Sequence, residues 1–197
     1  MLYSVLLKFF EVLFWIGRVK FEGRENIPAQ GSVILAANHL SLWDPIVIAA
    51  AVNRKINYMA KEELFENIFL ANFFSRLNAF PVKRGIPDRK SLKKGLELLA
   101  EGEVLGIFPE GTRSKTGELS KPQHGIAMLV LKGKAPVVPV ACLGTKKIFP
   151  WGWFSPVVII IGKPISYDEY YDAKVSTSLL EEVSKDIMDR ISLLHNN

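Results

Sequence analysis

A histidine and an aspartate stand five residues apart in the stretch NHLSLWDP, at His39 and Asp44. The stretch follows an apolar, strand-like run over residues 33–37 and leads into a helix-like pattern that begins at Pro45. An aspartate that accepts a hydrogen bond from a histidine fixes the tautomer of the ring, and the other ring nitrogen can then take a proton from a hydroxyl group. The pair therefore indicates general-base chemistry, provided that the backbone brings the two side chains together.

The two side chains can meet only if the backbone turns between them. On a regular helix, five residues rotate by roughly 500°, which leaves the side chains about 140° apart. Pro45 disfavours a helical conformation at Asp44 and itself suits the first helical position, so we expect a turn over residues 39–44. The alternative is that Asp44 only caps the following helix, through the free backbone N–H groups at its start.

Further chemically capable residues follow two other apolar runs. In the stretch FPEGTRS, Gly111 permits an unusual backbone angle or the close approach of a substrate. Arg113, two residues later, offers a planar fork for phosphate oxygens. Lys83 and Arg84 end another short strand-like run and could hold a phosphate jointly with Arg113. Taken singly, each stretch is equally typical of a turn with solvated cations.

Strand-like runs alternate with helix-like patterns along the chain. The strands are expected near residues 19–22, 32–37, 56–60, 79–82, 103–108, 136–142 and 156–162. The helices are expected near residues 45–52, 62–77, 88–101, 124–133 and 176–194. The alternation predicts a single α/β domain with a largely parallel or mixed central sheet flanked by helices. His39 would then lie at the C-terminal end of a strand, where open α/β sheets bind ligands.

The N-terminal segment predicts a helix with an unusually wide apolar face. On a helix, its polar residues fall within an arc of roughly 80°: Ser4, Lys8, Glu11 and Arg18. Lys8 and Glu11 interrupt the apolar run, and the run is therefore too short to span a bilayer, because a span takes roughly 20 apolar residues. We expect a membrane-interface helix over residues 1–18 and one domain over residues 19–197. Packing of the helix on the protein's own core is the alternative.

Net charge and composition restrict the classes of partner that the protein is expected to bind. The formal net charge of +5 favours anionic partners, namely phospholipid surfaces, phosphorylated substrates or nucleic acid. Nucleic acid is the least favoured, because the basic residues cluster in the single segment 83–94 and the aromatic residues lie elsewhere. The only cysteine, Cys142, leaves no intrachain disulfide and indicates a reducing compartment. Three scattered histidines and one cysteine form no metal-ligand cluster, so no metal is expected.

In this order, the stretches resemble the motifs of the glycerolipid acyltransferase family, and within it those of the 1-acylglycerol-3-phosphate acyltransferases. NHLSLWD matches the family's first motif, a histidine and an aspartate separated by four residues (HX4D). Residues 80–84 resemble the second motif, FPEGTRS matches the third, and residues 137–140 match the fourth. The resemblance extends from about residue 20 to about residue 165, which is most of the chain.

The resemblance implies a role for each matching residue. It makes His39 the general base and Asp44 the residue that orients it. It places the glycerol-phosphate site on Arg84, Glu110, Gly111 and Arg113, with Lys83 and Thr112 as weaker candidates.

The implied reaction transfers an acyl chain from acyl-CoA or an acyl carrier protein (acyl-ACP) to the 2-hydroxyl of lysophosphatidic acid, making phosphatidic acid at the cytoplasmic face of a membrane. The thioester is a co-substrate and no cofactor is implied. We expect no covalent acyl-enzyme, because no serine or cysteine lies in a nucleophile-elbow context. Two alternatives stay open: another acceptor, such as glycerol-3-phosphate or a different lysophospholipid, and a non-enzymatic module that binds anionic lipid.

Two aromatic stretches have more than one interpretation. Residues 62–77 carry a stripe at helical spacing that is typical of core packing, although it could line an acyl-chain groove: Leu64, Phe65, Ile68, Phe69, Phe73 and Phe74. Residues 148–154 hold four aromatic side chains around a proline and a glycine, which excludes a regular helix. That segment is either a second membrane contact or a loop packed on the core.

Overall fold

The computed structural model describes residues 2–148 and 156–196, and within these residues seven strands form one mixed sheet with the order β1-β7-β6-β2-β5-β3-β4. The strands are β1 (Lys20–Glu22), β2 (Val33–Ala37), β3 (Ile56–Lys61), β4 (Ala79–Val82), β5 (Val104–Ile107), β6 (Val137–Leu143) and β7 (Val158–Ile161). Strands β6, β2, β5, β3 and β4 are parallel neighbours. The strand β7 is antiparallel to β6, and β1 is parallel to β7.

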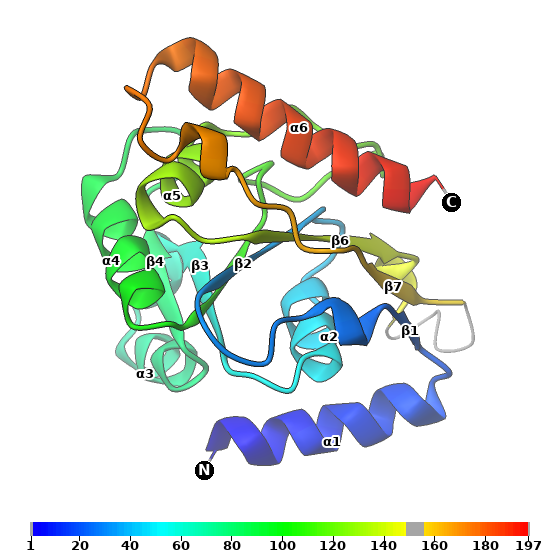
Figure 1. Ribbon diagram of the computed structural model, residues 1–197. Helices are drawn as coiled ribbons and strands as arrows, with labels where there is room; N and C mark the ends of the chain where they lie inside the picture. The colour runs from blue at the N-terminus through cyan, green and yellow to red at the C-terminus, as the bar shows by residue number, and fades with distance from the viewer. Residues whose placement is uncertain (1, 149–155, 197) are drawn as a thin grey trace.

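Helices cover both faces of this sheet. They are α1 (Leu2–Ile16), α2 (Asp44–Ala51), α3 (Ile68–Arg76), α4 (Arg89–Ala100), α5 (Gly125–Gly133) and α6 (Thr177–His195). Figure 1 shows α2 beneath the sheet, with α1 packed below it, and α4, α5 and α6 around the opposite face. The predicted single α/β domain with a mixed sheet flanked by helices is confirmed.

The central strand β2 shows why its sequence is continuously apolar. Every residue of β2 is buried, because successive side chains point to opposite faces and both faces are covered. Val33 and Leu35 pack into the cluster that contains α2, whereas Ile34 and Ala36 pack into the cluster that contains α4, α5 and α6. Two hydrophobic cores therefore hold β2 in register between β5 and β6.

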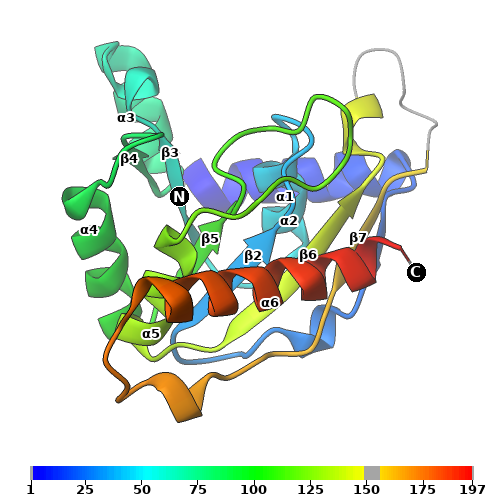
Figure 2. The same ribbon diagram turned by 90° about the horizontal axis from the view of Figure 1, so that it is seen from above.

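The loops that follow β2 and β5 leave the C-terminal edge of the sheet toward opposite faces. The chain leaves β2 for α2 on one face, and it leaves β5 for α5 on the other face. Neighbouring parallel strands whose following helices cover opposite faces create a crevice between their loops, where open α/β sheets bind ligands. Figure 2 shows the long loop after β5 and the turn after β2 together at one edge of the molecule.

Two expected elements differ in detail. The expected helix over residues 62–77 is a 3₁₀ turn, Glu62–Phe65, followed by α3. The side chain of Asn67 accepts hydrogen bonds from the backbone N–H groups of Phe69 and Leu70, which starts a new helix there. The N-terminal helix ends at Ile16, so Arg18, with a φ of 55°, lies outside the helical face on which the sequence placed it.

The helix α1 has one packed side and one open side. Its Phe14 is buried, and Phe10 contacts Trp43 at a ring-centroid distance of 6.1 Å. The opposite side exposes four large apolar residues, Phe9, Val12, Trp15 and Ile16. None of the helices in the described part of the chain has both the length and the apolar character to cross a bilayer. The aromatic segment 148–154 lies outside the described residues, apart from its buried first residue.

Candidate active site

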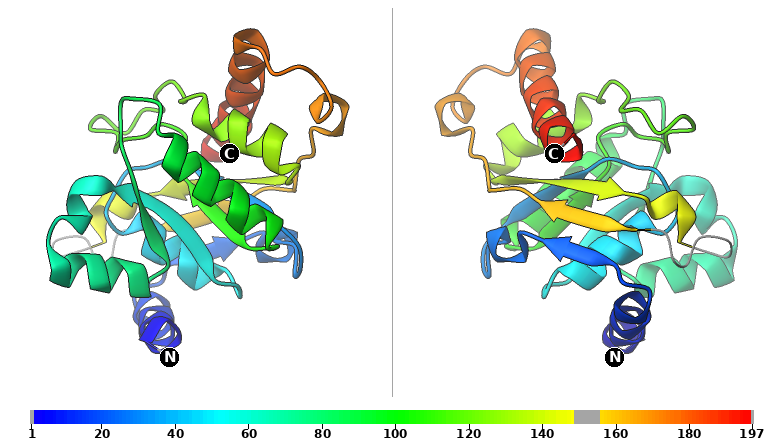
Figure 3. Two further views of the ribbon diagram at one scale, coloured as in Figure 1. Left: turned by 90° about the vertical axis from the view of Figure 1, so that its left-hand side faces the viewer. Right: turned by 90° about the vertical axis from the view of Figure 1, so that its right-hand side faces the viewer.

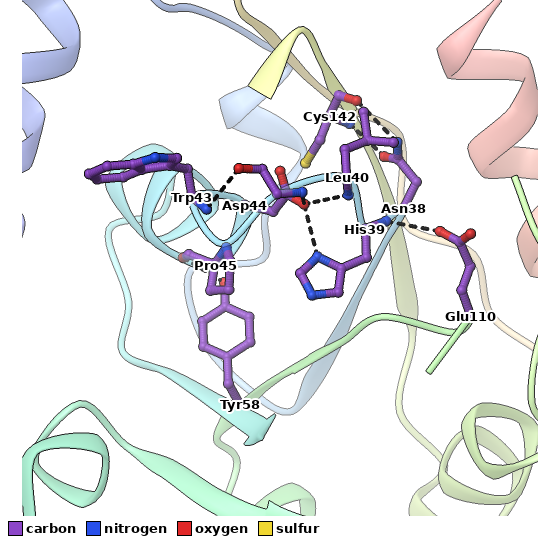
Figure 4. Close-up of polar contacts among 10 residues, drawn as sticks. Asn38, His39, Leu40, Trp43, Asp44, Pro45, Tyr58, Glu110 and Cys142 are labelled. Atoms are coloured by element: carbon purple, nitrogen blue, oxygen red, sulfur yellow. Dashed lines mark hydrogen bonds and ion pairs between the residues drawn. The ribbon is translucent and has the colours of Figure 1, made fainter. Parts of the chain in front are cut away.

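The imidazole of His39 and the carboxylate of Asp44 form a close pair at the C-terminal end of β2. His39 Nδ1 lies 2.9 Å from Asp44 Oδ2, and both residues are buried. Figure 4 shows Nδ1 turned toward the carboxylate and the second ring nitrogen pointing away from it. Because Asp44 occupies Nδ1, Nε2 is the nitrogen that can exchange a proton with a ligand.

The turn that joins the two residues is closed by Asp44 itself. Its Oδ2 accepts hydrogen bonds from the backbone N–H groups of Leu40 at 2.6 Å and Ser41 at 2.7 Å. The carboxylate therefore binds groups that precede α2, although it also begins that helix. The expected turn over residues 39–44 is present, and the hydrogen bonds of the Asp44 carboxylate go to His39, Leu40 and Ser41 rather than to the first N–H groups of α2.

Aromatic rings cover one face of the His39 imidazole. The ring of Phe108 stacks on it with a centroid distance of 4.0 Å and an interplanar angle of 18°. Tyr58 in turn stacks on Phe108 at 6.1 Å and donates its hydroxyl hydrogen to Pro45 O at 3.0 Å. Burial raises the pKa of Tyr58 well above its ordinary value, so the phenol stays protonated and keeps this bond. The imidazole is thus held by packing as well as by Asp44.

The loop after β5 is hydrogen-bonded to the backbone on both sides of His39. The N–H of His39 donates to Glu110 Oε1 at 2.9 Å, and the carbonyl of His39 accepts from the N–H of Ser114 at 2.8 Å. The other carboxylate oxygen of Glu110 accepts from the N–H of Ser120 at 2.9 Å. Glu110 is only 3% exposed, so its carboxylate serves as a buried clamp between two backbone segments.

A second tie joins the end of β2 to β6. The side chain of Asn38 donates to the carbonyl of Cys142 at 3.0 Å and accepts from the N–H of Cys142 at 2.7 Å. Both residues are fully buried. Burial, together with the nearby negative charge of Asp44, raises the pKa of the Cys142 thiol. Asn38 is therefore hydrogen-bonded to the neighbouring strand β6, and His39 is hydrogen-bonded to the loop that follows the other neighbour, β5.

The comparisons with known proteins decide the family. The sequence model of the family described as Acyltransferase matches residues 18–143, more than half of the chain. The chain belongs to the acyltransferase family. The prediction that it is an O-acyltransferase is confirmed.

Relatives of this acyltransferase support the assignment. It is 35% identical to the 1-acyl-sn-glycerol-3-phosphate acyltransferase of Bacillus subtilis, and the alignment covers 91% of this chain and 89% of that protein. It is 32% identical to a chloroplastic 1-acyl-sn-glycerol-3-phosphate acyltransferase of Arabidopsis thaliana over 75% of this chain and 44% of that longer protein. The crystal structure of the 1-acyl-sn-glycerophosphate (LPA) acyltransferase PlsC from Thermotoga maritima superposes with a TM-score of 0.69 at 27% identity, covering 98% and 89% of the two chains.

Two arginines of the acyltransferase follow different strands of the sheet. Arg84 follows β4, and Arg113 lies in the loop after β5, next to the Ser114 that is bonded to His39. Partial burial and, secondarily, the like charge of Arg113 lower the pKa of Arg84, with Glu63 opposing the effect. Arg113 thus adds unfavourable positive charge to the surroundings of Arg84, and a bound anion would offset that charge.

The remaining predicted site residues occupy different environments. The φ of Gly111 is 71°, and its N–H donates to Phe108 O at 3.0 Å, so it shapes the turn that carries Glu110. Thr112 is exposed in the same loop. Lys83 is half exposed, and its Nζ lies 3.8 Å from a carboxylate oxygen of Glu62, which competes with a phosphate for that charge.

Sequence reasoning assigned no role to two residues that support the dyad. Phe108, which covers the imidazole, was visible only as the apolar residue before the PEGTR turn. Asn38 was visible as a polar residue at the end of a fully apolar run, just before His39. A polar residue at the buried end of a strand needs a partner, so this position could have been singled out from the sequence.

Proposed function

We propose that this chain transfers an acyl group from an acyl thioester, acyl-CoA or acyl-ACP, to the 2-hydroxyl of lysophosphatidic acid and so makes phosphatidic acid. The Bacillus subtilis and Thermotoga maritima relatives carry this acceptor in their names. The observation that carries the proposal is the 2.9 Å contact between His39 Nδ1 and Asp44 Oδ2 at the ligand-binding edge of the sheet. The reaction needs no bound cofactor, because the thioester supplies the activated acyl group.

In this mechanism His39 acts first as a base and then as an acid. Its Nε2 takes the proton of the 2-hydroxyl as that oxygen attacks the thioester carbonyl carbon. Asp44 keeps the Nδ1 hydrogen in place and stabilises the imidazolium that forms. The tetrahedral intermediate collapses, the C–S bond breaks, and the departing thiolate takes the proton from Nε2. An ester and a thiol are the products, and the imidazole returns to its neutral state.

Arg84 and Arg113 are the proposed contacts for the phosphate of the acceptor. A guanidinium group binds phosphate oxygens through paired, charge-assisted hydrogen bonds. A bound phosphate would offset the positive charge that Arg113 adds to the surroundings of Arg84, which supports this assignment. Lys83 and Thr112 are weaker candidates at the edge of the same site.

We assign Glu110 a different part in this mechanism from the one that the family resemblance implied. Its two carboxylate oxygens accept hydrogen bonds from the backbone N–H groups of His39 and Ser120. A buried carboxylate would also repel the phosphate of the acceptor. Glu110 is therefore proposed to position His39, and the phosphate is left to the arginines.

The proposed enzyme works at the cytoplasmic face of a membrane, with α1 in the bilayer interface. The open side of α1 presents Phe9, Val12, Trp15 and Ile16, and Lys8 is exposed on the same helix. Exposed large apolar residues at this density are typical of helices that lie in the headgroup region. The acyl chains of the acceptor would then stay in the bilayer while its head group enters the site.

The proposal is tested by thiol release from acyl-CoA or acyl-ACP with purified protein, with and without lysophosphatidic acid. We expect release that depends on the acceptor and falls by roughly 10²–10⁴-fold in His39→Ala, the contribution of a positioned general base. The matched control is His195→Ala, at the far end of α6, which should keep full activity. Equal activity in both variants would remove His39 from the mechanism.

The acceptor is tested in the same assay. Lysophosphatidic acid, glycerol-3-phosphate and a lysophospholipid with a larger head group are compared at equal concentrations. A higher kcat/KM for either of the other two would leave the family assignment intact and replace the proposed acceptor.

A further inference from the structure

The short helix α3 turns its apolar side chains outward, which is the reverse of an ordinary surface helix. All nine residues of α3 are described, and none of them is buried. Phe69 is 81% exposed and Ile68 is 68% exposed, with Leu70 and Phe73 also exposed. A helix on a soluble protein normally buries its apolar side and shows its polar side to water. The prediction of core packing is therefore wrong for Ile68, Phe69 and Phe73, whereas the other three residues of the stripe, Leu64, Phe65 and Phe74, are partly buried.

The inward side of α3 is narrow. Phe74 and Ala71 are its partly buried residues, and Phe74 meets Phe65 at a ring-centroid distance of 6.1 Å. On helical geometry these two residues lie opposite Phe69 and Phe73. The helix is therefore attached along one edge, and its larger apolar surface faces away from the protein.

The helices α3 and α1 lie toward the same side of the molecule. Both views of Figure 3 show α1 and α3 toward the lower side, opposite α6. Exposed apolar residues continue in the segments beside the site, with Leu42 at 71% in the turn after β2 and Ile86 at 61% after β4. Apolar exposure spread over several elements marks an interaction surface, and a membrane is one type of partner for such a surface.

We propose that α3 inserts its exposed apolar face into the interface of a bilayer that contains anionic lipid, as a second docking element in addition to α1. This inference rests on the proposed function, because it uses the lipid acceptor to explain why the patch lies beside the site. Amphipathic helices bind such interfaces through buried apolar area and through attraction between cations and anionic head groups.

Charges around α3 fit head groups. Arg76 is exposed in the last turn of the helix, and Arg84, Arg89 and Lys90 are exposed just beyond β4. Three exposed glutamates precede the helix. Two of them are paired with lysines: Glu63 lies 2.7 Å from Lys61, and Glu62 lies 3.8 Å from Lys83; the third is Glu66. Exposed positive charge is thus present at the end of α3 and in the part of the chain that follows β4 and contains Arg84.

The position of α3 in the chain links its insertion to binding of the acceptor. The chain runs from α3 directly through β4 to Arg84, the proposed phosphate contact. A membrane against α3 would place that arginine at head-group level. A lysolipid could then move its phosphate into the site while its acyl chain remains in the bilayer.

The first test places a fluorophore on α3. The only native cysteine, Cys142, is fully buried, so a label goes to an introduced cysteine. Phe69→Cys and, as a matched control, Leu193→Cys on α6 are labelled with a polarity-sensitive dye and mixed with vesicles of phosphatidylcholine with about a third phosphatidylglycerol. Leu193 is also highly exposed, at 63%. We expect a blue shift and quenching by spin-labelled lipid at position 69 only. Vesicle binding with an unchanged spectrum at position 69 would overturn the proposal.

The second test separates a membrane from other partners. Phe69→Glu should weaken vesicle binding and activity on long-chain lysophosphatidic acid in vesicles by roughly tenfold or more. It should leave activity on a short-chain, water-soluble lysophosphatidic acid unchanged, and Leu193→Glu should change neither. Equal loss on both substrates would make α3 part of the acyl-chain site, and a change from dimer to monomer in sedimentation would make it a self-association surface. Either result overturns the proposal. Absent turnover in the wild type would instead refute the proposed function, and the fluorescence result would still stand.

Discussion

The backbone N–H of His39 donates a hydrogen bond to Glu110 Oε1 at 2.9 Å, although the two residues are 71 positions apart in the sequence. Asp44 controls the imidazole ring, and Glu110 controls the backbone that carries it. The pairing of β2 with β5 brings the two together, because each residue lies just beyond the end of one of these strands. The candidate base is thus positioned from both of the loops that border the crevice.

Glu110→Gln should lower kcat by roughly tenfold and leave the KM for lysophosphatidic acid unchanged. An amide has one acceptor oxygen, so it can satisfy only one of the two N–H groups that the carboxylate now accepts. The unfolding free energy should fall by about 1–3 kcal/mol, because one buried donor is left without a partner. Steady-state kinetics and denaturant titration measure both effects. A large rise in KM with normal kcat would return Glu110 to the acceptor site.

Asp44→Asn should reduce kcat/KM by roughly 10²–10⁴-fold, close to the effect of removing His39. The amide cannot stabilise the imidazolium, and its NH₂ group faces donors that now bind Oδ2. If the two residues act as a unit, the double variant His39→Ala with Asp44→Asn should be no slower than the slower single variant. Additive losses would show that they act independently.

Arg113→Ala and Arg84→Ala should each raise the KM for lysophosphatidic acid by about tenfold or more. A hydrogen bond to a charged group contributes about 1.5–3 kcal/mol, and each 1.4 kcal/mol is a factor of ten. Lysine at either position should restore only part of the affinity, because it lacks the planar fork. Added inorganic phosphate should inhibit the wild type more than either variant. A drop in kcat at constant KM would contradict a binding role.

Asp88→Ala should destabilise the fold at neutral pH and much less in acid. The side chain of Asp88 caps α4 and accepts the N–H of Lys83, and this bond, with further ones from Ser91 and Lys90, lowers its pKa. A lowered pKa contributes stability above the ordinary carboxyl pKa of about 3.9, and that contribution is lost as the pH falls through the folded-state value. Thermal unfolding at pH 7 should show a loss of about 1 kcal/mol. A loss of the same size at every pH, down to acid in which the folded-state carboxyl is protonated, would disprove that the cap depends on the charge of Asp88.

Several strands could be predicted from the sequence because they are short, continuously apolar runs, although β1 and β3 also contain polar residues. β2 is the clearest case, since all five of its residues are buried between two helical layers. The turn between His39 and Asp44 was also predictable, because Pro45 restricts the residue before it. Both predictions depend on local chain chemistry alone.

Long-range contacts could not be predicted in the same way. The clamp from Glu110 to His39 depends on which strands become neighbours, and the spacing of the motifs carries no information about that. The outward orientation of Phe69 was missed for a different reason. A stripe at helical spacing shows that a helix has an apolar face, but it does not show whether protein or lipid covers that face.

The tie between Asn38 and Cys142 has a consequence for an enzyme that handles activated acyl groups. Thiols exchange with thioesters when they are exposed and ionised, and an accessible cysteine would capture the acyl chain from its own donor. Here the only cysteine of the sequence, Cys142, is fully buried in the sheet, and burial raises the pKa of its thiol. The chain is thereby protected from acylating itself, so incubation with acyl donor alone should add no mass to the protein.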